Sequence, residues 1–210
     1  MKVLVACERS GIVRDAFINK GHDAWSCDLE PTERPGPHIK DDVQKVLDED
    51  WDLMIAHPPC TYLCNSGVRW LCSKEYLAPV GIVNNPRYWK MVDARRFFCD
   101  LLHCDIPKIC IENPIPHKWA ELRKYDQIIQ PWQFGHPEQK STCLWLKGLP
   151  KLYPTSTSLE CQNNRTHAKM MKLPKKERER IHFMSPGKNR SVERSRTYPG
   201  IAAAMAEQWG

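Results

Sequence analysis

The opening of the chain constrains the fold more than any other feature. Residues 2–6 (KVLVA) form a short apolar run, and after a turn at Gly11 apolar side chains recur at helical spacing from Ile12 to Phe17. Gly21 closes that helix, and residues 23–27 (DAWSC) predict a second strand. A strand, a helix and a strand this close together form a βαβ unit, the usual start of a doubly wound parallel sheet.

The rest of the chain continues this pattern. A mostly apolar segment at 51–56 runs directly into Pro58 and Pro59, which end a strand because proline cannot donate to the ladder. A chain of 210 residues can bury one good core. We therefore predict a single α/β domain over residues 1–210, with a Rossmann-like doubly wound sheet. The other predicted elements are a short helix at 43–47, a helix at 88–103, strands at 106–111, 127–132 and 142–146, and a last helix at 201–209.

Composition excludes several classes of protein. No stretch approaches the roughly 18 consecutive apolar residues of a membrane span, and the start at Met1 is charged too early for a signal peptide, so we expect a cytoplasmic protein without membrane contact. The ten cysteines are scattered and form no CxxC knuckle. We expect mostly free thiols and no bound metal.

The positive charge is concentrated late in the chain. The net charge is +6, and much of the excess lies in residues 169–180 and 188–196, which suits a polyanionic partner. The alternative is a solvated helix, because residues 175–180 mix both signs. Residues 150–196 are therefore predicted to form a small basic insertion in the domain.

Polar clusters follow three of the predicted strands. They are the turn at residues 7–11 (CERSG), Cys60 after its two prolines, and Glu112-Asn113. Because ligands of open α/β sheets bind at the carboxyl ends of the strands, these clusters are expected to converge on one site.

The second and third clusters resemble two motifs of the cytosine-C5 DNA methyltransferases. Pro59-Cys60 is similar to the Pro-Cys motif of that family and Glu112-Asn113 to its Glu-Asn motif, in the same order along the chain. The resemblance implies a sheet of the S-adenosylmethionine-dependent methyltransferase type, in a compact, phage-type form. It implies that Cys60 adds to C6 of cytosine, so that C5 can take the methyl group. Glu112, held partly protonated by burial, would protonate N3, and Asn113 would hold the Glu loop or contact the base.

The same resemblance implies a site for S-adenosylmethionine. Family members carry a Phe-x-Gly-x-Gly turn after the first strand, whereas this chain has one glycine there, Gly11. Asp28 is placed to accept from the ribose hydroxyls and Asp42 from the adenine amino group. The alternative for both aspartates is turn formation. The expected cofactor contacts are Cys7, Glu8, Ser10, Gly11, Asp28, Asp42 and Pro58.

DNA is the expected partner, bound by a monomer. Family members of ordinary size carry a separate target-recognition domain, but here only about fifty residues separate Leu146 from the closing helix, so little sequence discrimination is expected. Lys140 lies where the family has a basic pair, with a surface lysine as the alternative. The expected DNA contacts are Lys140, Arg165, Lys169, Lys172, Arg190 and Arg194.

Three other functions stay open. His57-Pro58-Pro59-Cys60 is similar to the Asp/Asn-Pro-Pro-aromatic motif of DNA amino-methyltransferases, but lacks the leading Asp or Asn and the aromatic residue. The same fold and cysteine would also serve an enzyme acting on RNA or on a free pyrimidine nucleotide. A catalytically inactive nucleic-acid-binding module is disfavoured by the intact Cys60 and Glu112. Phage and restriction-modification settings fit equally.

Overall fold

The predicted βαβ unit opens the structure. In this computed structural model, strands β1 (Lys2–Ala6) and β2 (Asp23–Asp28) pair in parallel and are joined by helix α1 (Ile12–Ile18). The structure describes residues 1–68, 71, 84–155, 165–185, 187 and 190–210.

The described residues form one seven-stranded sheet of order β3-β2-β1-β4-β5-β7-β6. The first five strands in this order are parallel, and β7 runs antiparallel to both of its neighbours. The strand order reverses between β1 and β4, and in open α/β sheets ligands usually bind at the carboxyl ends of the strands at such a point. The Rossmann-like α/β fold predicted from the sequence is thereby confirmed. The remaining strands are β3 (His38–Lys40), β4 (Leu53–Ala56), β5 (Lys108–Asn113), β6 (Gln127–Ile129) and β7 (Thr142–Lys147).

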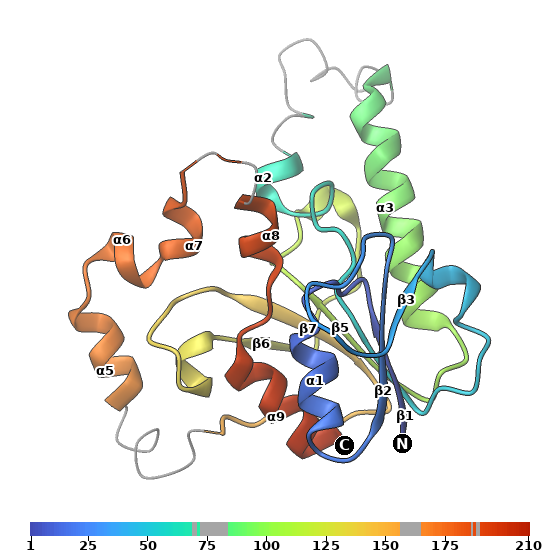
Figure 1. Ribbon diagram of the computed structural model, residues 1–210. Helices are drawn as coiled ribbons and strands as arrows, with labels where there is room; N and C mark the ends of the chain where they lie inside the picture. Colours follow the sequence, from blue (N-terminus) through green and yellow to red (C-terminus); the bar gives the residue numbers. More distant parts are fainter. Residues whose placement is uncertain (69–70, 72–83, 156–164, 186, 188–189) are drawn as a thin grey trace.

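Helices cover both faces of the sheet (Figure 1). Helix α1 packs against α9 (Pro199–Trp209) on one face, where α9 buries Ile201 and Met205 in the core. Helix α3 (Pro86–His103) lies on the other face and buries Phe98 and Leu101. The buried apolar side chains of α3 and α9 explain why the sequence predicted these two helices.

Several boundaries differ from the prediction. Strand β3 was not predicted, because three residues after a proline-rich loop are too short to show an apolar pattern. The short helix at 43–47 is a 3-10 turn, η1 (Val43–Lys45), and the strand predicted at 127–132 ends at Ile129. There Pro131 opens a second 3-10 turn, η6 (Pro131–Phe134).

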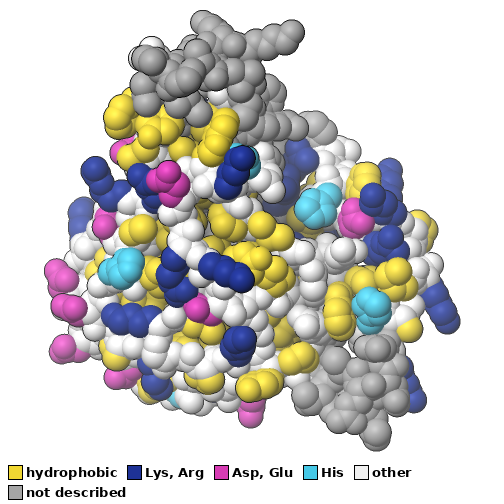
Figure 2. Space-filling view, turned by 180° about the vertical axis from the view of Figure 1, so that it is seen from behind, with side chains coloured by type: hydrophobic (Ala, Val, Ile, Leu, Met, Phe, Trp, Pro, Cys, Tyr) yellow, Lys and Arg dark blue, Asp and Glu magenta, His cyan; other side chains and the backbone are white. Residues whose placement is uncertain are grey.

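An arm of short helices projects beside the sheet (Figure 1). It lies within the segment 150–196 predicted as a basic insertion. Helix α5 packs on η6, where the rings of Trp132 and His167 lie 4.7 Å apart. Figure 2 shows Lys and Arg side chains spread along the edge of the molecule that carries this arm. Its helices are α5 (Arg165–Lys172), α6 (Lys175–Arg178), α7 (Arg180–Phe183) and α8 (Arg190–Ser195).

Candidate active site

The carboxyl ends of β4 and β5 bring the two motifs into contact. The Nδ2 of Asn113 donates to the carbonyl oxygen of Pro58 at 3.1 Å. Asn113 is buried, and its Oδ1 has no hydrogen-bond partner among the described residues. The loop that leads to Cys60 is therefore fixed to the Glu-Asn motif, and a buried acceptor stays available beside it.

A buried trio of side chains lies next to this contact. The Nδ1 of His57 is 3.3 Å from Oε2 of Glu112, and the hydroxyl of Thr197 donates to the same oxygen at 3.3 Å. His57 follows β4, Glu112 lies at the end of β5, and Thr197 precedes α9. Segments far apart in the sequence therefore converge here. Neither His57 nor Thr197 was a predicted site residue.

The partners of Glu112 in this trio favour its ionised form. Burial alone would raise the pKa of its carboxyl group, but the hydrogen bond and charge of His57, together with Lys140 and Thr197, lower that pKa below its usual value. These partners oppose the expected effect of burial, which was to hold Glu112 partly protonated. For His57, burial lowers the pKa, and Glu112 more than reverses this effect, so the net shift is upward. Both shifts favour a proton on the imidazole over one on the carboxyl group.

Cys60 begins a tight turn after the two prolines. Its carbonyl oxygen accepts from the backbone N–H groups of Leu63 at 3.0 Å and Cys64 at 3.1 Å. A hydrogen bond with the Cys64 thiol, followed by burial, raises the pKa of the Cys60 thiol, and the charge of Arg194 opposes this rise. Cys60 is thus a protonated thiol in the free protein, with a guanidinium nearby that favours the thiolate.

Side chains within the loop between β1 and α1 hold that loop in place. The carboxylate of Glu8, which is buried, accepts from the Ser10 hydroxyl at 2.9 Å and from the N–H groups of Val13 and Arg14 at 2.8 and 3.2 Å. Glu8 therefore satisfies the amino end of α1 from inside the protein. Glu8 and Ser10 therefore take part in holding the start of α1. Their contacts with the cofactor stay predictions.

Gly11 is explained by packing as well as by backbone conformation. Its φ is 69°, and a Cβ added there would lie 2.6 Å from the guanidinium of Arg14. Arg14 is fully buried and donates to Ser26, to Thr32 and to carbonyl groups of the loop at 34–37. This arginine fixes the loop that follows β2.

Three of the predicted cofactor residues do lie together. Burial, then the charge of Asp28, and to a lesser degree that of Asp42, raise the pKa of the Cys7 thiol to about 12. Asp28 uses one oxygen to accept from the N–H of Glu30 at 2.9 Å, and Asp42 caps η1 by accepting from Gln44 at 3.0 Å. Two carboxylates therefore lie beside the end of β1.

The predicted DNA contacts lie in two places. Lys140 is not a free surface lysine, because its Nζ donates to the carbonyl oxygens of Arg194 and Arg196 at 3.0 and 3.5 Å. Arg190 and Arg194 belong to α8. The positive charge of Arg194 lowers the pKa of the Cys60 thiol. The others, Arg165, Lys169 and Lys172, are exposed on α5.

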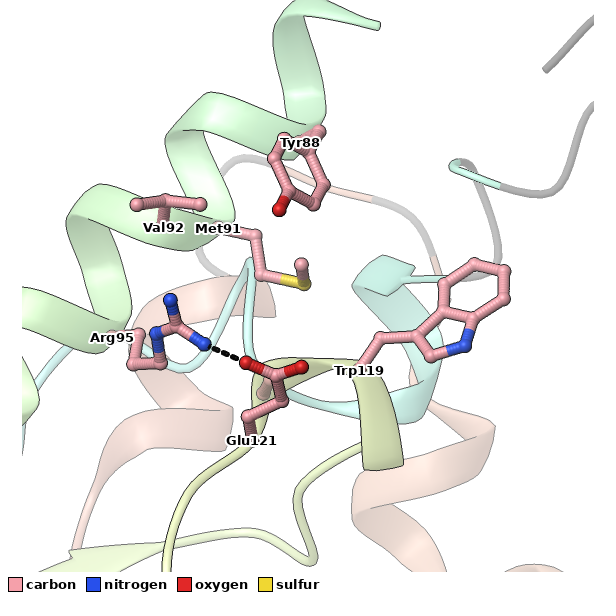
Figure 3. A pocket seen from close by; sticks show the side chains of 7 residues that line it. Tyr88, Met91, Val92, Arg95, Trp119 and Glu121 are labelled. Atoms are coloured by element: carbon pink, nitrogen blue, oxygen red, sulfur yellow. Dashed lines mark hydrogen bonds and ion pairs between the residues drawn. The ribbon is translucent and has the colours of Figure 1, made fainter. Parts of the chain in front are cut away.

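A separate pocket of about 210 Å³ opens between α3 and the 3-10 turn η5 (Lys118–Ala120). Tyr88, Met91 and Trp119 line it, and an ion pair between Arg95 and Glu121 lies at its side (Figure 3). The N–H of His117 donates to Leu63 at 2.8 Å, so the wall of this pocket also supports the turn after Cys60. No sequence pattern pointed to it.

The described parts of the chain contain no cluster of three or more His, Cys, Asp or Glu that suits a metal ion, and no described helix is long and apolar enough to cross a membrane. The eight cysteines among the described residues form no disulfide with one another. Cys72 and Cys161 lie outside those residues.

No protein-family model matches the chain, and no curated protein matches it. Among solved structures, the methyltransferase EhMeth of Entamoeba histolytica matches with a TM-score of 0.45 and 16% identity, over 73% of this chain and 56% of that chain. A protein assigned as a DNA modification methyltransferase, encoded within a prophage (E. coli), matches with a TM-score of 0.44 and 13% identity, over 70% and 46%. This chain spans about half the length of each. A likeness this distant gives no information on activity.

Proposed function

We propose that this chain transfers a methyl group from S-adenosylmethionine to C5 of cytosine in DNA, with Cys60 as the nucleophile. One observation carries the proposal: the Asn113–Pro58 hydrogen bond of 3.1 Å joins the Cys60 loop to the Glu112 motif at the carboxyl ends of β4 and β5. A thiol and a carboxylate held at one strand-end crevice are the two groups that addition to a pyrimidine ring requires.

The residues at the end of β1 suit the cofactor. The carboxylates of Asp28 and Asp42 are acceptors matched to ribose hydroxyls and to an adenine amino group, and both act on Cys7 at the end of β1, the strand that borders the strand-order switch. The orphaned Oδ1 of Asn113 is a further buried acceptor at the crevice. When bound, S-adenosylmethionine supplies an electrophilic methyl group on a sulfonium centre. The pattern of acceptors in this chain therefore fits the cofactor without a phosphate cradle.

The chain's own residues would act on the base. The Cys60 thiol first loses its proton to solvent, favoured by the nearby positive charge of Arg194. Its thiolate then forms a bond to C6 of cytosine, the electrons of the C5–C6 double bond shift onto the ring, and N3 takes a proton from the Glu112 side. After C5 is methylated and has lost its proton to solvent, the S–C6 bond breaks. N3 then returns its proton to the Glu112 side, which restores the aromatic ring, and the released Cys60 thiolate takes up a proton from solvent.

A nucleophile test follows from this mechanism. Cys60→Ser should abolish transfer of a labelled methyl group to DNA while leaving cofactor affinity near normal, because the thiol acts on the base and not on the cofactor. Cys99→Ser is the matched control, since Cys99 lies on α3 away from the strand ends. Wild-type turnover by Cys60→Ser would refute the role of Cys60.

A trapping experiment tests the covalent step directly. In DNA that contains 5-fluorocytosine, fluorine replaces the C5 proton, so the elimination that releases the enzyme is blocked. Wild-type protein and Cys99→Ser should form an adduct that survives denaturation, and Cys60→Ser should not. RNA and free cytidine nucleotides should be assayed in parallel. Transfer to either of these but not to DNA would overturn the assignment of the substrate.

A further inference from the structure

His57 is a buried titratable residue that the motif resemblance leaves without a task. It immediately precedes Pro58, and its side chain is 11% exposed. Its Nδ1 faces Glu112 at 3.3 Å, and its Nε2 is buried without a hydrogen-bond partner among the residues that the structure describes. In the proposed mechanism Glu112 must give a proton to the base. A histidine in contact with its carboxylate is in position to supply that proton.

The charges around His57 favour an imidazolium ion. Glu112 faces it from β5, Glu8 from the loop between β1 and α1, and Lys140 from the segment before β7. Thr197, from the segment before α9, adds a hydroxyl group but no charge. Two carboxylates and one ammonium leave one negative charge in this buried cluster, and a proton on His57 balances it.

We propose that His57 holds the proton that Glu112 delivers to N3 of the base, an inference that rests on the proposed function. As the Cys60 thiolate adds to C6, the Nδ1–H bond of His57 breaks and an O–H bond forms on Glu112. That O–H bond then breaks as the N3–H bond forms. When Cys60 leaves, the proton returns by the same route, so no proton is gained or lost by the pair. His57 is a positioning residue, since it acts through Glu112.

The electrostatics agree with this arrangement. Glu112 raises the pKa of His57 above its ordinary value, and His57 lowers the pKa of Glu112, so both shifts favour a proton on the imidazole. It is lost as pH rises through the folded-state pKa of His57. The rate of base addition should therefore fall on the alkaline side at that pKa.

Two measurements test the proposal. In ¹⁵N-imidazole NMR of the cofactor-free protein, with the His57 signal assigned by its loss in His57→Gln, His57 should titrate above its ordinary pKa of 6.5. Glu112→Gln should lower that value. A His57 that stays neutral from pH 5 to 8, or one that Glu112→Gln leaves unchanged, would overturn the proposal.

The second measurement is the single-turnover rate of methyl transfer against pH. The pH at which this rate falls on the alkaline side should equal the pKa of His57 measured by NMR. In His57→Gln the fall should occur at a different pH. Glutamine keeps a hydrogen-bond donor for Glu112 but cannot hold the proton, so a purely structural His57 would leave that pH unchanged and overturn the proposal. Absence of transfer by the wild type would overturn the proposed function and the delivery step. The NMR titration would still decide where the proton lies.

Discussion

At the scale of single residues, the partners of Glu112 decide its ionisation more than its burial does. A motif resemblance supplies the identity of Glu112 and Cys60, because both follow strands whose apolar runs are visible in the sequence. It cannot supply His57 and Thr197, which reach Glu112 only through the fold. Without these partners, burial predicts a protonated carboxyl group, and with them the pKa moves in the opposite direction. The sequence therefore identifies the two candidate reactive side chains but not the shifts in their pKa values.

Asp28 allows a test of the cofactor site at this scale. Asp28→Ala should weaken S-adenosylmethionine binding by about 1.5 to 3 kcal/mol, roughly ten- to a hundredfold, because a charged acceptor for two hydroxyl groups is lost. Calorimetry on the free protein measures this. Asp23→Ala is the matched control, since Asp23 lies at the opposite end of the same strand, where it accepts from Trp25 at 2.9 Å. Equal affinities for wild type and Asp28→Ala would show that Asp28 does not bind the cofactor.

At the scale of elements, strands and helices with clear apolar periodicity were predictable, and the turns between them were not. The sequence shows Gly11 as a turn residue, but the reason for it lies in Arg14, whose guanidinium occupies the space a side chain would need. Likewise β3 owes its place to its pairing with β2, along a loop that Arg14 fixes through buried hydrogen bonds. Long-range contacts of this kind leave no local pattern in the sequence.

Gly11→Ala should destabilise the protein by about 2 to 5 kcal/mol. A left-handed conformation costs a residue with a Cβ about 1 to 2 kcal/mol, and displacing the buried guanidinium of Arg14 adds about 1 to 3 kcal/mol. Gly21→Ala separates the two contributions. Gly21 also has a positive φ, of 83°, but no atom lies within 4 Å of an added Cβ, so only the backbone cost of about 1 to 2 kcal/mol remains. Urea unfolding of both variants measures the difference, and equal losses would exclude the role of Arg14.

At the scale of the whole molecule, the arm from α5 to α8 connects the basic part of the chain to the candidate active site. Lys140 donates to the backbone at the end of α8, and Arg196 pairs with Glu33 in the loop after β2 at 2.6 Å. These contacts hold Arg194 near Cys60 while α5 stays exposed on the outer edge. The charge pattern of the sequence indicated a basic segment. It gave no sign that the two ends of that segment differ, because the difference arises from the packing of α5 on η6 and from the contacts of the other end with Lys140 and Glu33.

DNA binding should therefore depend on salt through the exposed end of the arm. Neutralising phosphates releases counterions, so the logarithm of affinity falls linearly with the logarithm of salt concentration, by about 0.9 per contact. The double variant Lys169→Gln and Lys172→Gln should lower this slope by about 1.8 if both lysines contact phosphates. Its charge-matched control is Lys40→Gln with Lys45→Gln, two exposed lysines on β3 and η1, away from the arm. Fluorescence anisotropy of a labelled duplex between 50 and 200 mM salt measures all three proteins. Because a phosphate contact carries no sequence information, the arm variant should weaken binding to unrelated duplexes equally. Equal slopes for the arm variant and the control would show that the positive charge of the whole molecule, and not the arm, attracts the DNA.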